Sequence, residues 1–286
     1  MIASIRKSDP SVLLLDGGAA FGGSRDVAQL QVKAMEAMGY DALNLGGPEF
    51  NFGREFLEHA RSAVSFPYIA SNLLYGGSRL PWTREYVIKE TGGIKIAILG
   101  VSDPDDFGQP PDREQVKGLE VIPPETALRR LLPEVGEKVD LVILLSQLDV
   151  EKTRALVNAV KGIDVAISSG NDNVFYAAMP ENTVLLQTGS QGKTLGLLKI
   201  SLDEKGLLRV DENRYLPLLS SVPDDAKVAR LVEEFKETQK QKAAELARKR
   251  YEMTYQGLME GLQLSPQEFM ERYGIEQTEK KKGEPR

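Results

Sequence analysis

Several residues that could bind a ligand lie in loops that follow short apolar segments. They are Asp16, Gly47, Glu49, Asn51, Gln147, Asn171, Asp172 and Asn173. Carboxylate and amide oxygens are hard ligands that suit Mg²⁺ or Ca²⁺ better than Zn²⁺, Mn²⁺ or Fe. The carboxyl ends of strands in an open α/β sheet converge on one crevice, where such folds bind ligands. We therefore expect these residues to line one neutral or weakly acidic cleft.

Simpler structural roles compete with ligand binding at the same residues. Asp16 ends an apolar segment, where a carboxylate commonly caps the following turn. Glu49 could accept hydrogen bonds from loop amides. The segment Asn171-Asp172-Asn173 consists of residue types that favour turns. Both interpretations stay open at this point.

The chain contains no cysteine and one histidine, which is His59. The lack of cysteine excludes disulfides, thiolate zinc sites and a cysteine nucleophile. A catalytic transition-metal site usually draws on several imidazoles, and we expect His59 to lie on an exposed helix face. The sequence therefore predicts no cofactor, no tightly bound transition metal and no catalytic residue.

The 286 residues carry a formal net charge of -6, and the pI is about 5.2. Lys and Arg are spread out and the acidic balance repels phosphate backbones, so we expect no nucleic-acid binding. Lys280-Lys281-Lys282 is interpreted as part of a solvated polar tail. No apolar run is long enough to cross a bilayer, so we expect no membrane insertion.

The first residues lack the charged-then-apolar order of a signal peptide. The location stays open: cytoplasmic, or periplasmic or extracellular if an upstream leader has been removed.

Short apolar runs alternate with segments of helical periodicity. The predicted strands are Val12–Leu15, Tyr40–Leu45, Tyr68–Ala70, Tyr86–Lys89, Ile94–Val101, Asp140–Ser146, Ile163–Ile167, Thr183–Gln187, Leu195–Leu202 and Leu207–Leu216. The predicted helices are Ser24–Met38, Gly53–Ser62, Pro124–Val139 and Val150–Val160. Strand–helix–strand passes with fully apolar strands favour a parallel sheet in an α/β fold. We expect Val12–Leu15, Ala42–Leu45, Leu141–Leu145 and Val165–Ile167 to be adjacent buried strands.

Local signals fix several element ends. Ser24 is a plausible helix N-cap, and Gly39 is the matching C-cap. Gly92-Gly93 predicts a tight hairpin. The segment Asp103–Gln115 is rich in proline and acidic residues and is predicted to be an exposed loop.

The composition changes near Asp224. Residues 1–223 are predicted to form one α/β domain, and residues 224–286 a helical extension with a polar tail. The extension has an apolar stripe that includes Val228 and Phe235, and Ser265 to Glu268 reads as a capping box that opens a last short helix. The partner is predicted to be an unidentified ligand or protein, with the C-terminal helix as the candidate docking element.

Gly39 to Gly53 reads Gly-Tyr-Asp-Ala-Leu-Asn-Leu-Gly-Gly-Pro-Glu-Phe-Asn-Phe-Gly. This segment resembles the 5′-nucleotidase branch of the calcineurin-like metallophosphoesterases, which carries Gly-Asn-His-Glu-Phe-Asp at the same place. Further blocks resemble the family in its order: Leu13–Ala19, Ala70–Asn72, Leu144–Gln147, Ile163–Asn173 and Gln187–Gly196. The resemblance covers most of the chain before the helical extension. It implies a two-sheet α/β sandwich flanked by helices.

The same resemblance implies that the family's chemistry is missing. At positions that match metal ligands the chain has Ala19, Gly47, Gln147, Asn171 and Asn173, and at the catalytic dyad it has Pro48 and Asn51. The leading expectation is a catalytically inactive nucleotidase-like protein that binds or scaffolds. The alternative is a phosphoester hydrolase in which oxygen ligands from Asp16, Gln147 and Asn171–Asn173 hold Mg²⁺ or Ca²⁺.

The family's opening strand, with an Asp-x-His metal motif, has no counterpart in this chain. We expect the full protein to begin upstream of Met1, because losing that strand would leave a position in the central sheet unfilled.

Overall fold

The structure is a computed structural model and describes residues 1–107, 115–169, 174–178 and 183–273. The chain divides into two compact units, Met1–Leu231 and Val232–Arg286. The first unit contains every strand of the described residues and all of the candidate site residues that fall within them.

The larger sheet of the first unit has six strands in the order β10-β11-β9-β8-β6-β5. Its strands are β5 (Tyr86–Thr91), β6 (Ile94–Val101), β8 (Leu141–Ser146), β9 (Val165–Ser168), β10 (Val174–Ala178) and β11 (Val184–Thr188). The four central strands run parallel, and the two edge strands are antiparallel to their neighbours. Every residue of β8 is buried, as expected for a parallel strand covered on both faces.

A second sheet of three parallel strands lies against the first. It has the order β1-β2-β3, with β1 (Leu15–Asp16), β2 (Ala42–Asn44) and β3 (Tyr68–Ile69). An antiparallel ribbon of β12 (Thr194–Leu202) and β13 (Leu208–Pro217) packs against the same inter-sheet core through alternate apolar side chains. A small two-stranded sheet pairs β4 (Leu73–Tyr75) with β7 (Leu119–Val121).

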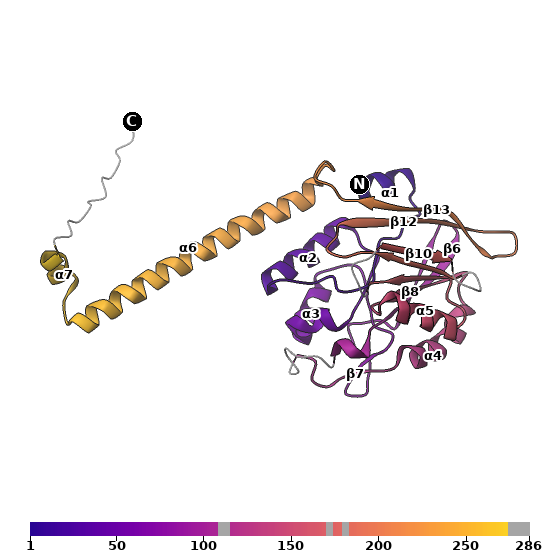
Figure 1. Cartoon of the computed structure of the whole chain (residues 1–286), viewed down its shortest axis with the longest axis horizontal. Coiled ribbons are helices and arrows are strands. Elements are labelled where there is room, and N and C mark those ends of the chain that lie inside the picture. The colour runs from indigo at the N-terminus through magenta and orange to yellow at the C-terminus, as the bar shows by residue number, and fades with distance from the viewer. Residues whose placement is uncertain (108–114, 170–173, 179–182, 274–286) are drawn as a thin grey trace. The chain divides into compact units, whose positions relative to one another are not determined.

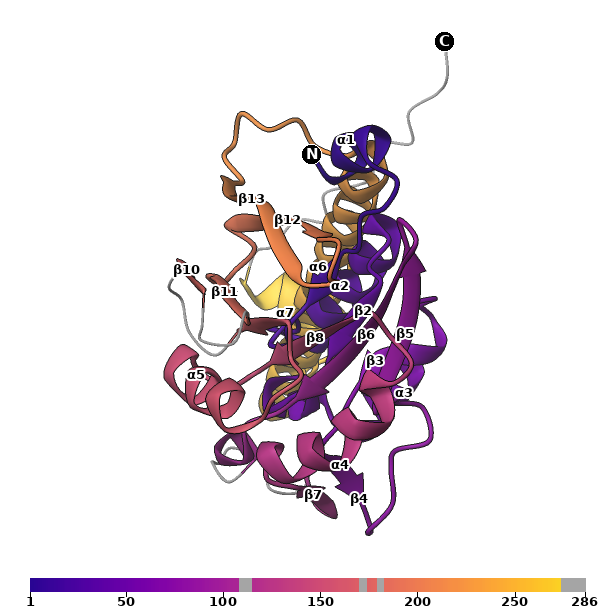
Figure 2. The same cartoon turned by 90° about the vertical axis from the view of Figure 1, so that its right-hand side faces the viewer.

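Helices cover the outer faces of both sheets (Figures 1 and 2). The first unit has helices α1 (Ile2–Ser8), α2 (Arg25–Met38), α3 (Arg54–Ser62), α4 (Pro124–Gly136) and α5 (Val150–Ala159), and two short 3₁₀ turns, η1 (Gly47–Phe52) and η2 (Pro104–Phe107). One core packs α2 and α3 on the small sheet. Another packs α4 and α5 on the large sheet, and a third fills the space between the sheets.

The predicted two-sheet α/β sandwich flanked by helices is therefore confirmed. Apolar side chains of β8 alternate between the two faces of the sheet, because successive residues of a strand point to opposite sides. Both faces of this strand are covered by a core. Val142 and Leu144 join the helix-covered core, whereas Ile143 and Leu145 join the inter-sheet core.

Several local predictions are confirmed. The Ser24 side chain accepts a hydrogen bond from the backbone N–H of Val27, and Gly39 ends α2 in the left-handed region at φ 70°. Gly92 and Gly93 form the β5–β6 turn with φ values of 58° and 78°, as a tight hairpin requires. His59 is exposed on α3.

One prediction about arrangement is wrong, and another is confirmed only in part. The four strands expected to be adjacent are divided between the two sheets, with β1 beside β2 and β8 beside β9. The segment from Asp103 was predicted to be an exposed loop: Asp103 is only 8% exposed, whereas Pro104, Asp105 and Asp106 are exposed as expected and form η2 with Phe107. Residues 108–114 of that loop lie outside the described residues.

The described part of the second unit, up to Tyr273, is mainly helical. Helix α6 (Ala226–Leu262) begins in the first unit and supplies most of the second, and α7 (Pro266–Tyr273) follows it. The predicted capping box is confirmed: the backbone N–H of Ser265 donates to Oε2 of Glu268, and the N–H of Glu268 donates to Oγ of Ser265. The ring of Tyr255 meets that of Phe269 edge-on, which holds α7 against α6. Within the described residues, no helix combines the length and apolar character needed to cross a membrane.

Candidate functional site

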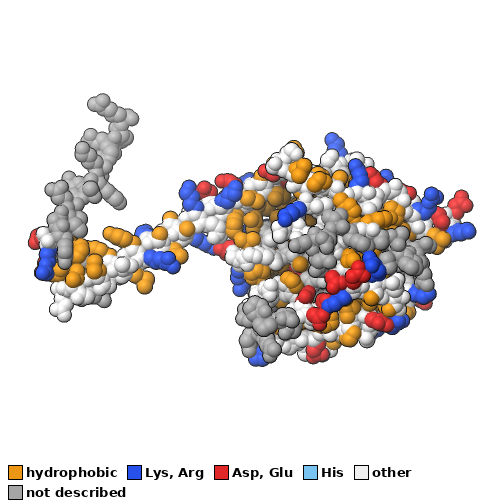
Figure 3. Space-filling view, in the orientation of Figure 1, with side chains coloured by type: hydrophobic (Ala, Val, Ile, Leu, Met, Phe, Trp, Pro, Cys, Tyr) orange, Lys and Arg blue, Asp and Glu red, His pale blue; other side chains and the backbone are white. Residues whose placement is uncertain are grey.

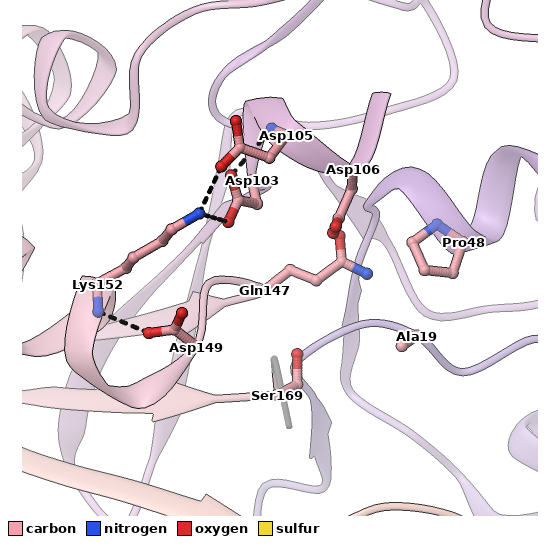
Figure 4. Close-up of a pocket in the computed structure, with 9 residues that line it drawn as sticks. All are labelled: Ala19, Pro48, Asp103, Asp105, Asp106, Gln147, Asp149, Lys152 and Ser169. Atoms are coloured by element: carbon pink, nitrogen blue, oxygen red, sulfur yellow. Dashed lines mark hydrogen bonds and ion pairs between the residues drawn. The ribbon is translucent and has the colours of Figure 1, made fainter. Parts of the chain in front are cut away.

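A cleft of about 340 Å³ opens at the carboxyl ends of strands from both sheets. It is lined by Ala19, Pro48, Asp103, Asp105, Asp106, Gln147, Asp149, Lys152 and Ser169. Figure 4 shows these residues arriving from separate loops and from the first turn of α5. The loops follow β1, β2, β6, β8 and β9, so the sheet topology brings together residues far apart in sequence.

Glu49 lies beneath the cleft and joins its loops. It is fully buried. Oε1 accepts a hydrogen bond of 2.6 Å from the backbone N–H of Ala20, and Oε2 accepts one of 3.0 Å from Gly46. The amide of Gln147 lies 3.4 Å from the same Oε2. The expectation that Glu49 could bind loop amides thus describes its observed contacts.

Burial changes the protonation of two carboxyl groups in this region. Desolvation raises the pKa of Glu49 to about 7, although the backbone N–H groups of Gly46 and Ala20 oppose the change. Desolvation also raises the pKa of Asp16 to about 6, opposed by the N–H of Gly18. The two carboxyl groups repel each other, because the charge of Asp16 adds to the rise at Glu49.

Gly46 and Gly47 are tightly enclosed. A Cβ on Gly46 would overlap the side-chain amide of Gln147. A Cβ on Gly47 would lie 2.6 Å from Cβ of Asp106 and 2.9 Å from its backbone oxygen. Real Cβ atoms essentially never approach other atoms this closely, so η2 occupies the space that a side chain at position 47 would need.

An ion-pair network holds η2 over the cleft. Nζ of Lys152 lies 2.7 Å from Oδ2 of Asp103 and 2.6 Å from Oδ2 of Asp105, as the dashed lines in Figure 4 show. Hydrogen bonds to Asp103 and then Asp105 raise the pKa of Lys152, so it stays protonated. Asp149 caps α5 by accepting from the backbone N–H of Lys152 at 2.8 Å.

The cleft retains an excess of negative charge. Its lining contains four aspartates and one lysine, a formal charge of −3 when all are ionised. Desolvation, followed by the charge of Asp103, raises the pKa of Asp106. Elsewhere on the face of the first unit shown in Figure 3, acidic and basic side chains are interspersed.

The predicted site residues are distributed unevenly around this cleft. Gln147 lines it, with 4% of its surface exposed. Gly47 and Glu49 lie behind its wall, and Asp16 is partly buried near Glu49. Asn51 is exposed and is not among the lining residues. Asn171, Asp172 and Asn173 lie outside the described residues, so their part in the cleft stays a prediction.

Sequence reasoning missed the residues that give the cleft its charge. Asp103, Asp105 and Asp106 were assigned to an exposed loop, and Asp149 and Lys152 to the start of a helix. One available signal was that Asp103 comes two residues after a mainly apolar strand, near the position that Gln147 occupies after β8. The pairing of Lys152 with η2 leaves no trace in the local sequence.

Comparisons with known proteins agree with this architecture. The 5′-nucleotidase of Bos taurus is 27% identical over 264 residues, which cover 79% of this chain and 44% of that relative. Calcineurin-like phosphoesterase YfkN from Bacillus subtilis superposes with a TM-score of 0.70 and 21% identity, covering 83% of this chain and 86% of that chain. No protein-family model matches the chain.

A third comparison gives the same answer. A putative 5′-nucleotidase from Staphylococcus aureus, solved with alpha-ketoglutarate, superposes with a TM-score of 0.71 at 20% identity and covers 82% of this chain and 51% of that one. In sequence and fold the chain is similar to the 5′-nucleotidase-like branch of the metallophosphoesterases. It spans 44% of the length of the bovine relative.

Metallophosphoesterases hold two metal ions, and the residues of this chain do not fit such a pair. Ala19 and Pro48 line the cleft without a side-chain donor atom, and Gly47 has no side chain. Asp103 and Asp105 carry carboxylates, but both are bound to Lys152. Within the described residues, no three His, Cys, Asp or Glu side chains are grouped so that they could hold a metal ion.

Proposed function

We propose that this metallophosphoesterase-like protein is catalytically inactive and serves as a binding or scaffolding domain. The observation that carries the proposal is the packing of Asp106 against Gly47. The resemblance places a metal-ligating Asn at position 47. A Cβ there would lie 2.6 Å from the Asp106 side chain and 2.9 Å from its backbone oxygen. The cleft therefore lacks a side chain at position 47, and Asp106 of η2 also occupies the space that such a side chain would need.

The chemistry of the lining supports the same conclusion. Two-metal hydrolysis of a phosphoester needs a bridging carboxylate to hold two cations about 4 Å apart. Ala19 stands where the resemblance places that carboxylate. A histidine at position 48 would stabilise the leaving alkoxide, whereas proline has no side-chain proton to donate. Lys152, the one cationic lining residue, is held by two carboxylates and is not directed at a phosphate.

Metal content and hydrolysis test the proposal together. Purified protein would be assayed for bound metals by elemental analysis, and for hydrolysis of an aryl phosphate and AMP with Mg²⁺, Ca²⁺, Mn²⁺ or Zn²⁺. We expect no stoichiometric Zn, Mn or Fe and no metal-dependent turnover. Turnover with Mg²⁺ or Ca²⁺ alone would instead support the alternative, a hydrolase with oxygen ligands from Asp16, Gln147 and Asn171–Asn173.

A reversion experiment sharpens the test. Pro48→His restores one catalytic group and leaves every metal-ligand position unchanged, so we expect it to remain inactive. The supporting groups act as a unit, and activity should require Ala19→Asp, Gly47→Asn, Pro48→His, Gln147→His, Asn171→His and Asn173→His together, with relief of the contact at Asp106. Metal-dependent hydrolysis by Pro48→His alone would show that the site is not dismantled.

A further inference from the structure

The charge of the cleft determines which ligands it can attract. Four lining carboxylates face one ammonium group. A phosphate or nucleotide entering this space would meet net negative charge at close range, and opposite-sign attraction is what draws a charged ligand into a cleft. The same field attracts a positively charged ligand.

Lys152 shows that the carboxylates of the lining bind an alkylammonium group. Its alkylammonium group bridges two carboxylates at 2.7 and 2.6 Å, which is the short range typical of charge-assisted hydrogen bonds. An amine from a ligand could make the same kind of contact with the remaining acceptors. Asp106 is the lining carboxylate that neither pairs with Lys152 nor caps α5.

A buried acceptor faces the same space. Gln147 is 4% exposed, and its Oε1 has no hydrogen-bond partner among the described residues. Leaving such a buried oxygen without a hydrogen bond is unfavourable. Figure 4 shows the Gln147 amide and the Asp106 carboxyl group extending toward each other from the loops after β8 and β6. The Gln147 amide lies against Gly46 and the Asp106 side chain lies against Gly47, and these two glycines are adjacent in the sequence.

We infer that the cleft binds an organic cation, a small ligand whose protonated amine donates hydrogen bonds to Asp106 and to Oε1 of Gln147. The inference rests on the proposed non-catalytic binding function and names its ligand class. The volume of about 340 Å³ lies at the small end of ligand pockets. Ser169 supplies a hydroxyl group in the lining that could contact a polar substituent.

Isothermal titration calorimetry with matched probes tests the inference. Diaminobutane would be compared with butanediol, an uncharged molecule of similar shape, and with inorganic phosphate, AMP, Mg²⁺ and Ca²⁺, all in an amine-free buffer. We expect saturable binding of the diamine that weakens with added salt, and no binding of the diol, phosphate or AMP. A diol that binds as well as the diamine would overturn the inference, as would a site that prefers Mg²⁺ or Ca²⁺ to the amine.

Two substitutions should change the affinity in opposite directions. Asp106→Asn removes a free acceptor charge and should weaken diamine binding about fivefold. Lys152→Met keeps the aliphatic stem and releases Asp103 and Asp105, so a ligand ammonium can replace the lysine and bind about fivefold more tightly. Glu90→Gln on β5 removes one negative charge, as Asp106→Asn does, but at an exposed position outside the cleft lining, and it should leave the affinity unaltered. Equal affinities in all three variants would place the diamine outside this cleft.

The outcomes separate this inference from the proposed function. If the protein neither binds diaminobutane nor hydrolyses AMP, the proposed ligand class is refuted and the proposed inactive domain is not. Binding and hydrolysis of AMP with Mg²⁺ would refute both.

Discussion

Replacing Glu49 by glutamine should remove a defined part of the pH dependence of stability. The folded protein raises the pKa of this carboxyl group from 4.5 to about 7, chiefly by desolvation. Between these values the unfolded chain has already lost the proton that the folded chain retains. Rising pH therefore favours unfolding over this window, and the loss is complete once the pH exceeds the folded value.

The magnitude follows from the two pKa values. From about pH 5 to about pH 8, the linkage relation gives a loss of about 2.5 kcal/mol in the free energy of unfolding from Glu49 alone. Asp16, with its pKa raised to about 6, acts in the same direction. Asp16 is present in both proteins, so their comparison reports Glu49 together with its interaction with Asp16.

Urea unfolding of wild type and Glu49→Gln at the two pH values is the assay. The variant should lose about 2.5 kcal/mol less than wild type as the pH rises, whatever its stability at the lower value. Glu58→Gln, an exposed substitution on α3, is the matched control and should retain the wild-type dependence. Identical pH dependence in wild type and Glu49→Gln would refute the assignment of a protonated, buried Glu49.

Two further substitutions test the packing around the site. Gly47→Ala should destabilise the protein by about 1–3 kcal/mol in urea unfolding because its Cβ meets Asp106. The control Gly22→Ala, whose Cβ has nothing within 4 Å, should change stability by about 0.5 kcal/mol or less. Equal effects of the two substitutions would contradict the close packing of Asp106 on Gly47. Asn44→Leu should cost about 1–3 kcal/mol, since it removes two buried hydrogen bonds, to the carbonyl groups of Gly17 and Val101 at 3.0 and 2.9 Å. Each carbonyl keeps a second donor, Oγ of Ser169 and the N–H of Gln147. The exposed Asn158→Ala should be nearly neutral, and an equally neutral Asn44→Leu would show that the two Asn44 hydrogen bonds add nothing to stability.

Local sequence determined the strands and turns well because their signals lie within a few residues. The apolar run in β8 and the Gly92-Gly93 turn are examples. The division of the strands between two sheets could not be predicted this way, since β2 and β8 are both short, fully buried strands and pairing depends on distant segments. Short apolar strands are buried equally well in one sheet or in two, because helices cover the outer faces and a shared core fills the space between the sheets.

The site illustrates the same limit. Gln147 was found because Leu144–Gln147 resembles a ligand block of the family at the end of a predicted strand. Asp103 to Asp106 sit in a polar, proline-containing segment that has the composition of a solvated loop. Their placement depends on Gly47, which leaves room for η2, and on Lys152, which binds it. Both residues are more than forty positions away in the sequence, so no local pattern reports them.

The close packing of Asp106 on Gly47 bears on how this branch could evolve. With η2 seated, an asparagine at position 47 is obstructed, so the first reverting mutation would reduce stability before it restored any function. Under the proposed function, a substitution that restores a metal ligand at position 47 would first have to displace η2. The packing of one loop therefore opposes the recovery of a functional group on another.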